Sequence, residues 1–232
     1  TGEDSTGEGT VGGEPAARPL VTTIERALSV LDLIAGSDQH DMGVTEIARE
    51  LGLSKAVIHR VLTTLVARDY LQVDGVSRRY RLGPMALVLG SAYLDGLDLR
   101  TLALPRLQEL SQRTGETATF SLRNGHTRMY VDQVTPDREI KMTVPIGKSY
   151  PLHAGSSSKS FLAFLPEDEQ DAYLRDRELT RLTGTTIVDP TVLRTELRAV
   201  RERGYALSLE ERQAGAGSIA APILDRSGRP IA

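Results

Sequence analysis

The stretch VTEIARELGLSKAVIHRVLTTLVARDYL, residues 44–71, constrains the fold of this chain more than any other. Apolar residues recur in it with helical spacing, in two runs separated by a glycine. Gly52 suits the left-handed backbone of a sharp helix exit, and Ser54 is a ready N-cap for the second helix. Thr45 is the expected N-cap of the first. The pattern therefore predicts two short helices joined by a tight turn and held at a steep angle.

A further helix precedes this pair and a hairpin follows it. Residues 22–36 repeat apolar side chains at helical spacing, with Thr22 or Thr23 as the expected cap and Gly36 as the stop. After the pair, Asp74-Gly75 is a strong turn signal between two short strands. Helix, helix, glycine turn, helix and hairpin is the order of a winged helix-turn-helix, whose third helix is free to enter a DNA major groove.

Positive charge is concentrated in this region, although the chain as a whole is acidic. Residues 44–82 hold seven Lys/Arg against four Asp/Glu, a balance of +3, whereas the whole chain carries −3. A basic patch neutralises phosphates and releases counterions, although a charged helix face is more often merely solvated. Because the first turn of a recognition helix points at base edges, the candidates for base readout are Ser54, Lys55, Ala56 and His59. The other candidates for DNA contact are Arg60 and Thr64 for phosphate, Arg78, Arg79 and Arg81 on the wing, and Thr45.

Composition excludes several classes of protein. The 232 residues suffice for one or two domains, and the absence of cysteine excludes a disulfide scaffold or a thiolate zinc site. The four histidines are scattered without a metal-ligand spacing, so we expect no metal and no cofactor. No apolar run is long enough for a membrane span, and we expect a cytoplasmic protein. The Gly-, Ser- and Glu-rich residues 1–19 predict a disordered tail.

A second domain is expected after the hairpin. We place the winged helix-turn-helix at residues 20–83, a linker helix at 84–99, and a second domain at 100–232. The linker is apolar nearly all round, which predicts burial on several sides and contact with a second subunit. Beyond it, the pattern predicts an α+β domain with a helix from 102 to 114, strands at 117–123, 127–134 and 139–147, a helix opening at HAGSSSKSFLAF, a helix near Pro166, a helix from Asp189-Pro190 to Arg203, and two final strands. The last strand is expected to be incomplete.

The stretch HAGSSSKSFLAF, residues 153–164, has three possible functions. Ser156 and Lys159 match Ser-x-x-Lys, the nucleophile motif of some serine hydrolases, but no Ser-Asp-Asn or Lys-Thr-Gly accompanies them. Gly147-Lys148-Ser149 resembles the end of a phosphate loop, but Met142 stands where its first glycine belongs. The third possibility is a binding site in which the N–H groups of a helix start and the hydroxyls of Ser156 and Ser157 hold an anion. Serines that simply cap the helix are the structural alternative.

Four blocks of the sequence together resemble one known family. They read GVTEIARELGLSKAVIHRVLTTLVARDYL, RRYRLG, YPLHAGSSSKSFLAFLP and ERGYALSLEERQAGAGSIAAPILDRSGRPIA. In order and spacing they resemble the IclR family of transcriptional regulators, from Val21 to Ala232. The resemblance implies an N-terminal winged helix-turn-helix, a linker helix and a C-terminal GAF-like α/β domain with a mainly antiparallel sheet. It also implies dimers or tetramers, a small-molecule effector, and no enzymatic activity.

The resemblance also implies where an effector binds. Carried over by position, the pocket residues are Met142, Ser156, Ser157, Ser208 and Ser218, beside Gly155, with Glu210 and Glu211 as neighbouring acidic candidates. Some members have an acidic residue in place of Ser208 and glycine or alanine at 156 and 157, which predicts a different effector from that of glyoxylate- and pyruvate-responsive members. His153 is expected to be structural. A small carboxylate or aromatic acid is the expected effector class, and a regulator without an effector is the alternative; the operator and the sign of regulation stay open.

Overall fold

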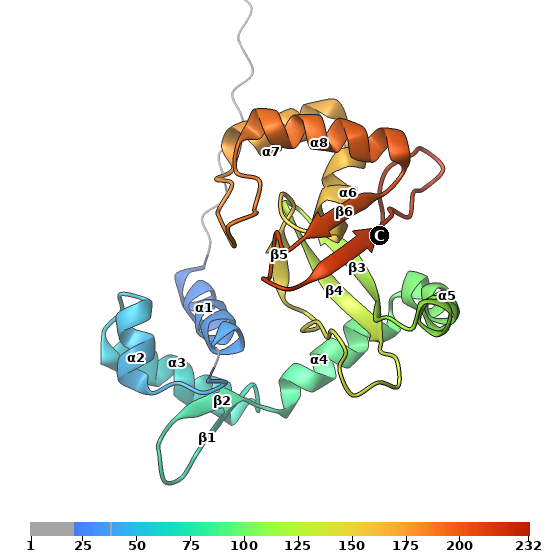
Figure 1. The fold of residues 1–232 in the computed structure, drawn as a ribbon. Helices are drawn as coiled ribbons and strands as arrows, with labels where there is room; N and C mark the ends of the chain where they lie inside the picture. Colours follow the sequence, from blue (N-terminus) through green and yellow to red (C-terminus); the bar gives the residue numbers. More distant parts are fainter. Residues whose placement is uncertain (1–20, 38) are drawn as a thin grey trace, which may run out of the picture. The chain divides into compact units, whose positions relative to one another are not determined.

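The computed structural model describes residues 21–37 and 39–232. The tail predicted at residues 1–19 lies outside the described residues. The chain divides into two compact units with the boundary between Gly90 and Ser91. Each unit has its own hydrophobic core, and Figure 1 shows the helices and strands of both.

The first unit contains three helices and a hairpin: α1 (Thr22–Gly36), α2 (Val44–Glu50), α3 (Lys55–Ala67), β1 (Leu71–Val73) and β2 (Tyr80–Leu82). The two strands pair antiparallel. This order confirms the predicted winged helix-turn-helix. Its core is formed by apolar residues from all three helices and the first strand: Val30, Ile34, Ile47, Ile58, Val61, Leu62, Leu65 and Leu71.

Local signals explain most of this unit, but two predicted caps are wrong. Ser54 caps α3 as expected, since its Oγ accepts a hydrogen bond from the N–H of Val57 at 3.4 Å. Gly52 has φ 63°, the left-handed conformation that the sharp exit from α2 requires. However, α1 begins after Val21 and α2 after Gly43, without a threonine cap. At α2 the carboxylate of Glu46 accepts from the N–H of Gly43 instead, at 3.0 Å, which leaves Thr45 on the exposed first turn.

Helix α4 (Pro84–Asp95) crosses the boundary between the units and ends four residues before the predicted end of the linker. None of its residues is buried, and several large apolar side chains are exposed: Leu87, Val88, Leu89 and Tyr93. The expected burial of this helix is therefore absent within the described chain.

The second unit is an α+β domain with two antiparallel sheets. Its first part contains α5 (Asp98–Thr114), β3 (Ala118–Asn124), β4 (Thr127–Val134) and β5 (Ser149–Pro151). Its second part contains α6 (Ser156–Phe164), α7 (Glu167–Asp176), α8 (Pro190–Arg203), β6 (Ala206–Leu209) and β7 (Gly217–Ala220). The sheets have the orders β3-β4-β5 and β6-β7. These elements confirm a C-terminal domain of helices and mainly antiparallel strands.

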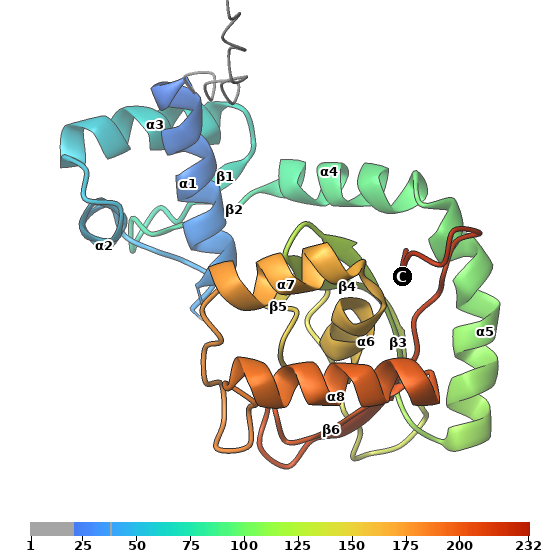
Figure 2. The same ribbon diagram turned by 90° about the horizontal axis from the view of Figure 1, so that it is seen from above.

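Helix α6 lies at the centre of this domain. It packs against α8 and against β6 and β7, and Figure 2 shows it between α7 and α8. Seven of its nine residues are buried, and they include three of its four serines as well as apolar residues. The core around it contains Leu152, Phe161, Leu162, Leu193, Leu197, Val200 and Ala206.

The strand predicted at residues 139–147 is wrong, because this segment has no regular structure. The side-chain amide of Gln133 on β4 binds both the carbonyl and the N–H of Val144, each at 3.0 Å. One side chain thus satisfies the groups that a strand partner would bind, and Pro145 next in the chain has no N–H to donate.

Within residues 21–37 and 39–232, no helix combines the length and the hydropathy that crossing a membrane requires.

Candidate nucleic-acid interface and effector site

The exposed face of α3 carries the residues predicted to contact DNA. Lys55, Ala56, His59 and Arg60 are exposed there, while Ile58, Val61, Leu62 and Leu65 hold the opposite face in the core. The hydroxyl of Thr64 is also exposed but donates to the carbonyl of Arg60 at 3.0 Å. Lys55 and Arg60 form no ion pair among the described residues. The helix therefore presents two available cations and an imidazole.

The three wing arginines differ in their surroundings. Arg78 is exposed at the hairpin turn, with φ 57°. The guanidinium of Arg79 instead lies 2.6 Å from Asp41 Oδ1 and 3.0 Å from Glu46 Oε2. The pKa of Glu46 lies below its ordinary value because the carboxylate accepts from the N–H of Gly43 and from Arg79. Arg79 thus ties the wing to the start of α2, whereas Arg78 at the turn and Arg81 on β2 are both exposed to solvent.

Three serines predicted to line an effector pocket come together in the second unit. Ser156 begins α6 and is buried, and its hydroxyl donates to Ser218 Oγ on β7 at 2.8 Å. Ser218 is the cross-strand partner of Ser208 on β6. The side chain of Ser208 is buried, like that of Ser156. Gly155 holds the N-cap position of α6 with φ 88°. Four of the predicted residues therefore lie together at the start of α6: Gly155, Ser156, Ser208 and Ser218.

Lys159, the lysine of the Ser-x-x-Lys match, is buried and bound by two carboxylates. The side chain of Lys159 is 2% exposed, and its Nζ lies 2.5 Å from Glu211 Oε1 and 3.2 Å from Glu196 Oε1. The other oxygen of Glu211 accepts from the N–H of Gly155 at 3.1 Å. Because the ammonium is bound by two carboxylates and the hydroxyl of Ser156 donates to another serine, this pair lacks the base that a nucleophile needs. The hydrolase hypothesis has no support in this geometry.

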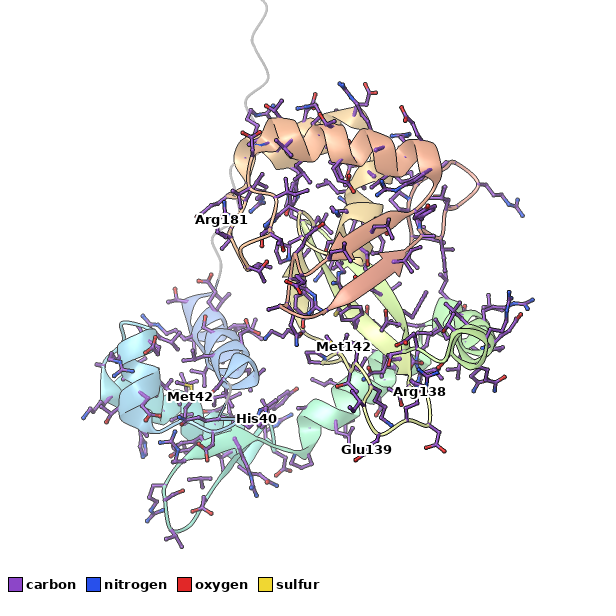
Figure 3. All side chains as sticks on the ribbon, in the orientation of Figure 1. His40, Met42, Arg138, Glu139, Met142 and Arg181 are labelled. Atoms are coloured by element: carbon purple, nitrogen blue, oxygen red, sulfur yellow. The ribbon has the colours of Figure 1, made fainter. Side chains whose placement is uncertain are left out.

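The remaining predicted pocket residues differ in their surroundings. Met142 is half-buried in the segment between β4 and β5 (Figure 3), and its carbonyl accepts from Thr117 Oγ1 at 2.5 Å. Ser157 is half-buried, and its carbonyl accepts from Ser160. Glu210 is exposed, with φ 60°, so its neighbour Glu211 is the acidic residue at the helix start.

His153 is structural, as expected. Its ring is buried, with Nε2 2.9 Å from the carbonyl of Thr180 and Nδ1 3.4 Å from Tyr173 Oη. Nε2 therefore carries the proton that the carbonyl accepts. Burial lowers the pKa of His153 from its ordinary value, so the neutral ring is the form that suits this position.

Two arginines beside α6 were not predicted from the sequence. Arg128 on β4 is 1% exposed, and its Nε donates to Ser158 Oγ at 3.0 Å. Burial lowers the pKa of Arg128 from its ordinary value. Arg212 follows Glu211 and lies over the ring of Tyr150. The available signal was strand alternation, because Arg128 is two residues from the buried Tyr130 in the same strand.

A winged helix-turn-helix with a basic exposed recognition helix defines a DNA-binding transcriptional regulator. Comparison with known proteins specifies which kind. Residues 23–75 match the family model "IclR helix-turn-helix domain", and residues 91–232 match "Bacterial transcriptional regulator IclR C-terminal". The chain belongs to the IclR family, and it is a regulator rather than an enzyme.

Relatives and solved structures of the family cover most of the chain. "HTH-type transcriptional regulator BhcR" of Paracoccus denitrificans is 37% identical over 212 residues, which are 91% of this chain and 75% of the relative. An IclR-type regulator from Alicyclobacillus acidocaldarius superimposes with a TM-score of 0.82 at 30% identity, covering 92% of this chain and 86% of that one. An IclR homologue from Microbacterium hydrocarbonoxydans, solved in complex with 4-hydroxybenzoate, gives 0.75 at 25% identity, with coverages of 90% and 85%.

Proposed function

We propose that this regulator binds an operator through α3 and the wing, and that a small carboxylate or aromatic acid at the start of α6 changes its affinity for DNA. The observation that carries the DNA part is the exposed cationic face of α3. In this proposal Ser54, Lys55, Ala56 and His59 read bases, while Thr45, Arg60, Thr64 and Arg78 contact phosphate. Arg79 is assigned to holding the wing. The protein would act in the cytoplasm, on chromosomal DNA.

The effector part is supported by the cluster of Ser156, Ser208 and Ser218 beside Gly155. A helix start offers N–H groups to an anion, and hydroxyls can orient it. The homologue solved with 4-hydroxybenzoate supports an acid of this class as the ligand. To regulate, the effector must bind two states of the protein with unequal affinity, because only such a difference moves the equilibrium.

Assembly into a homodimer or homotetramer is part of the proposal. A winged helix reads one half-site, and a two-fold dimer reads an inverted repeat. The exposed apolar residues of α4 are the surface that we assign to contact with a second copy: Leu87, Val88, Leu89 and Tyr93.

DNA binding can be tested with an operator selected from a random duplex library. Fluorescence anisotropy would give the Kd at several salt concentrations for the wild type and for Lys55→Ala and Arg60→Ala. Arg60→Ala, which loses a phosphate contact, should weaken binding and reduce the slope of log K against log salt by about 1, and Lys55→Ala, which loses a base contact, should weaken binding. Arg181→Ala, which removes an exposed arginine of the second unit, is the matched control. Unchanged affinity and slope in both α3 variants would refute the assignment.

Effector binding can be tested by thermal shift with a panel of small carboxylates and aromatic acids. A ligand at 100 times its Kd adds about 2.7 kcal/mol of stability. Ser156→Ala should weaken the response to the active compound, while Ser160→Ala should not, because the hydroxyl of Ser160 donates to a carbonyl of its own helix. Equal responses of the two variants would remove Ser156 from the site. An active compound that leaves operator affinity unchanged would exclude an effector role.

A further inference from the structure

Two arginines of the second unit share one pair of tyrosine rings. The Cζ of Arg128 lies 4.0 Å from the ring centre of Tyr130 and 4.8 Å from that of Tyr150. The Cζ of Arg212 lies 5.8 Å and 4.6 Å from the same two centres. The rings themselves meet edge to face, 5.8 Å apart. Two guanidinium groups that repel each other are thus held close together, one buried and one half-buried.

No carboxylate of the described residues balances these two charges. Neither arginine forms an ion pair with a described residue, and the buried Nη1 of Arg128 has no hydrogen-bond partner there. The two acids beside α6 bind other cations: the buried Glu211 binds Lys159, and the half-buried Glu196 binds Lys159 and Arg203. An unpaired buried cation is costly, and the faces of the tyrosine rings offset only part of that cost. The cluster therefore has an excess of positive charge.

The two arginines also meet the start of α6. Arg128 binds the hydroxyl of Ser158 on the first turn. A Cβ on Gly155 would lie 3.7 Å from Arg212 Cβ, so the side chain of Arg212 passes directly over the N-cap position. The carboxylate of Glu211 accepts from the N–H of Gly155, but no described side chain accepts from the N–H groups of the first turn of this helix. The positive end of the helix dipole and two cations therefore coincide at one place.

We propose that Arg128 and Arg212 bind the carboxylate group of a small acid at the start of α6, between the rings of Tyr130 and Tyr150 and the serine cluster. A guanidinium presents two parallel N–H donors that match the two oxygens of a carboxylate. Arg128 is the inner donor, with Nη1 still available, and Arg212 is the outer one. The inference rests on the proposed effector-binding role of this domain, and it identifies the charged group that the domain recognises.

The test uses acid and amide pairs of equal shape on the full chain: acetate with acetamide, and benzoate with benzamide. Thermal shifts are measured at constant ionic strength, with sodium chloride replacing the acid salt, and Kd follows from the dependence on concentration. At least one acid should raise Tm while its amide does not. Removing one guanidinium, in Arg128→Met or Arg212→Met, should weaken that Kd about tenfold or more.

Two further variants control the experiment. Arg201→Met removes an exposed guanidinium that lies over Phe164, at 5.9 Å from its ring centre, and should bind the acid like the wild type. Arg128→Lys keeps the charge but loses the two-pronged donor, so it should also bind more weakly, which tests the site even where Arg128→Met fails to fold. The inference is overturned where no acid raises Tm, where an amide acts as strongly as its acid, or where both Met variants bind the acid with wild-type affinity.

The same samples separate this inference from the proposed function. An amide that raises Tm and alters operator affinity would contradict the proposed carboxylate site. It would still support the proposal that the protein is an effector-responsive regulator. An acid that binds through both arginines but leaves operator affinity unchanged would support the site and contradict the effector role.

Discussion

The buried ion pair at the centre of the second unit makes a sharp prediction about stability. Lys159→Met keeps most of the volume of the side chain but removes the ammonium that two carboxylates bind. Glu196 retains Arg203 as a partner at 2.9 Å, whereas Glu211, 9% exposed, retains only the N–H of Gly155. The cost therefore falls on Glu211, a buried carboxylate left without a cation. Breaking a buried pair in this way destabilises a protein by about 3–5 kcal/mol.

The loss corresponds to a fall in Tm of roughly 6–20 °C for a protein of this size. Circular dichroism in the far-ultraviolet and in the tyrosine band would follow the unfolding of the domain. The double variant Lys159→Met/Glu211→Gln should recover a large part of the loss, because the amide is uncharged and still accepts from Gly155. Lys148→Met, at an exposed lysine, is the control. Melting of Lys159→Met within about 2 °C of the wild type, or a double variant no more stable than the single one, would refute the reasoning.

Other predictions concern pH, capping and assembly. The pKa of His153 is lowered in the folded protein, so its contribution to stability is complete above the unfolded pKa of about 6.5 and is lost as pH falls through the folded pKa. Tm should therefore fall less on acidification in His153→Gln than in the wild type; equal slopes would contradict this. Asp189 Oδ1 accepts from two N–H groups at the start of α8, so Asp189→Ala should cost about 1 kcal/mol in urea unfolding, against no change in Asp176→Ala. Leu87→Glu should lower the oligomeric state in sedimentation velocity, and an unaltered oligomer would exclude α4 from the interface.

The first unit could be predicted from its sequence because its determinants are local. Ser54, Gly52 and the Asp74-Gly75 turn act within a few residues of their own positions, and the structure has a helix start, a helix exit and a hairpin there. Periodicity showed which faces are apolar but not what covers them. Ile24 and Leu28 belong to the predicted stripe of α1, yet both are more than half exposed, at 58% and 55%. Burial depends on neighbours that spacing does not specify.

The parts of the second unit that sequence reasoning missed depend on long-range pairing. Residues 139–147 have a composition typical of a strand, but whether they pair depends on what the end of β4 offers, and Gln133 offers a side chain instead. Arg128 and Arg212 come together across 84 positions of sequence, and Lys159 and Glu211 across 52. A single sequence contains no signal that joins such positions. Ser156 could be proposed from its place at a helix start, which is a local feature, whereas Ser208 and Ser218, on two strands, came only from the family resemblance.

The ion pairs of Arg79 have a consequence for the speed of DNA recognition. A hairpin loop left to itself would sample many conformations, and each encounter with DNA would have to wait for a suitable one. Arg79 holds the hairpin to Asp41 and Glu46 before any encounter. The entropy of ordering the wing is then lost during folding and not during association. In the proposed complex, Arg78 at the turn would therefore reach the duplex in a fixed place, and the fraction of productive collisions would rise without any additional contact to DNA.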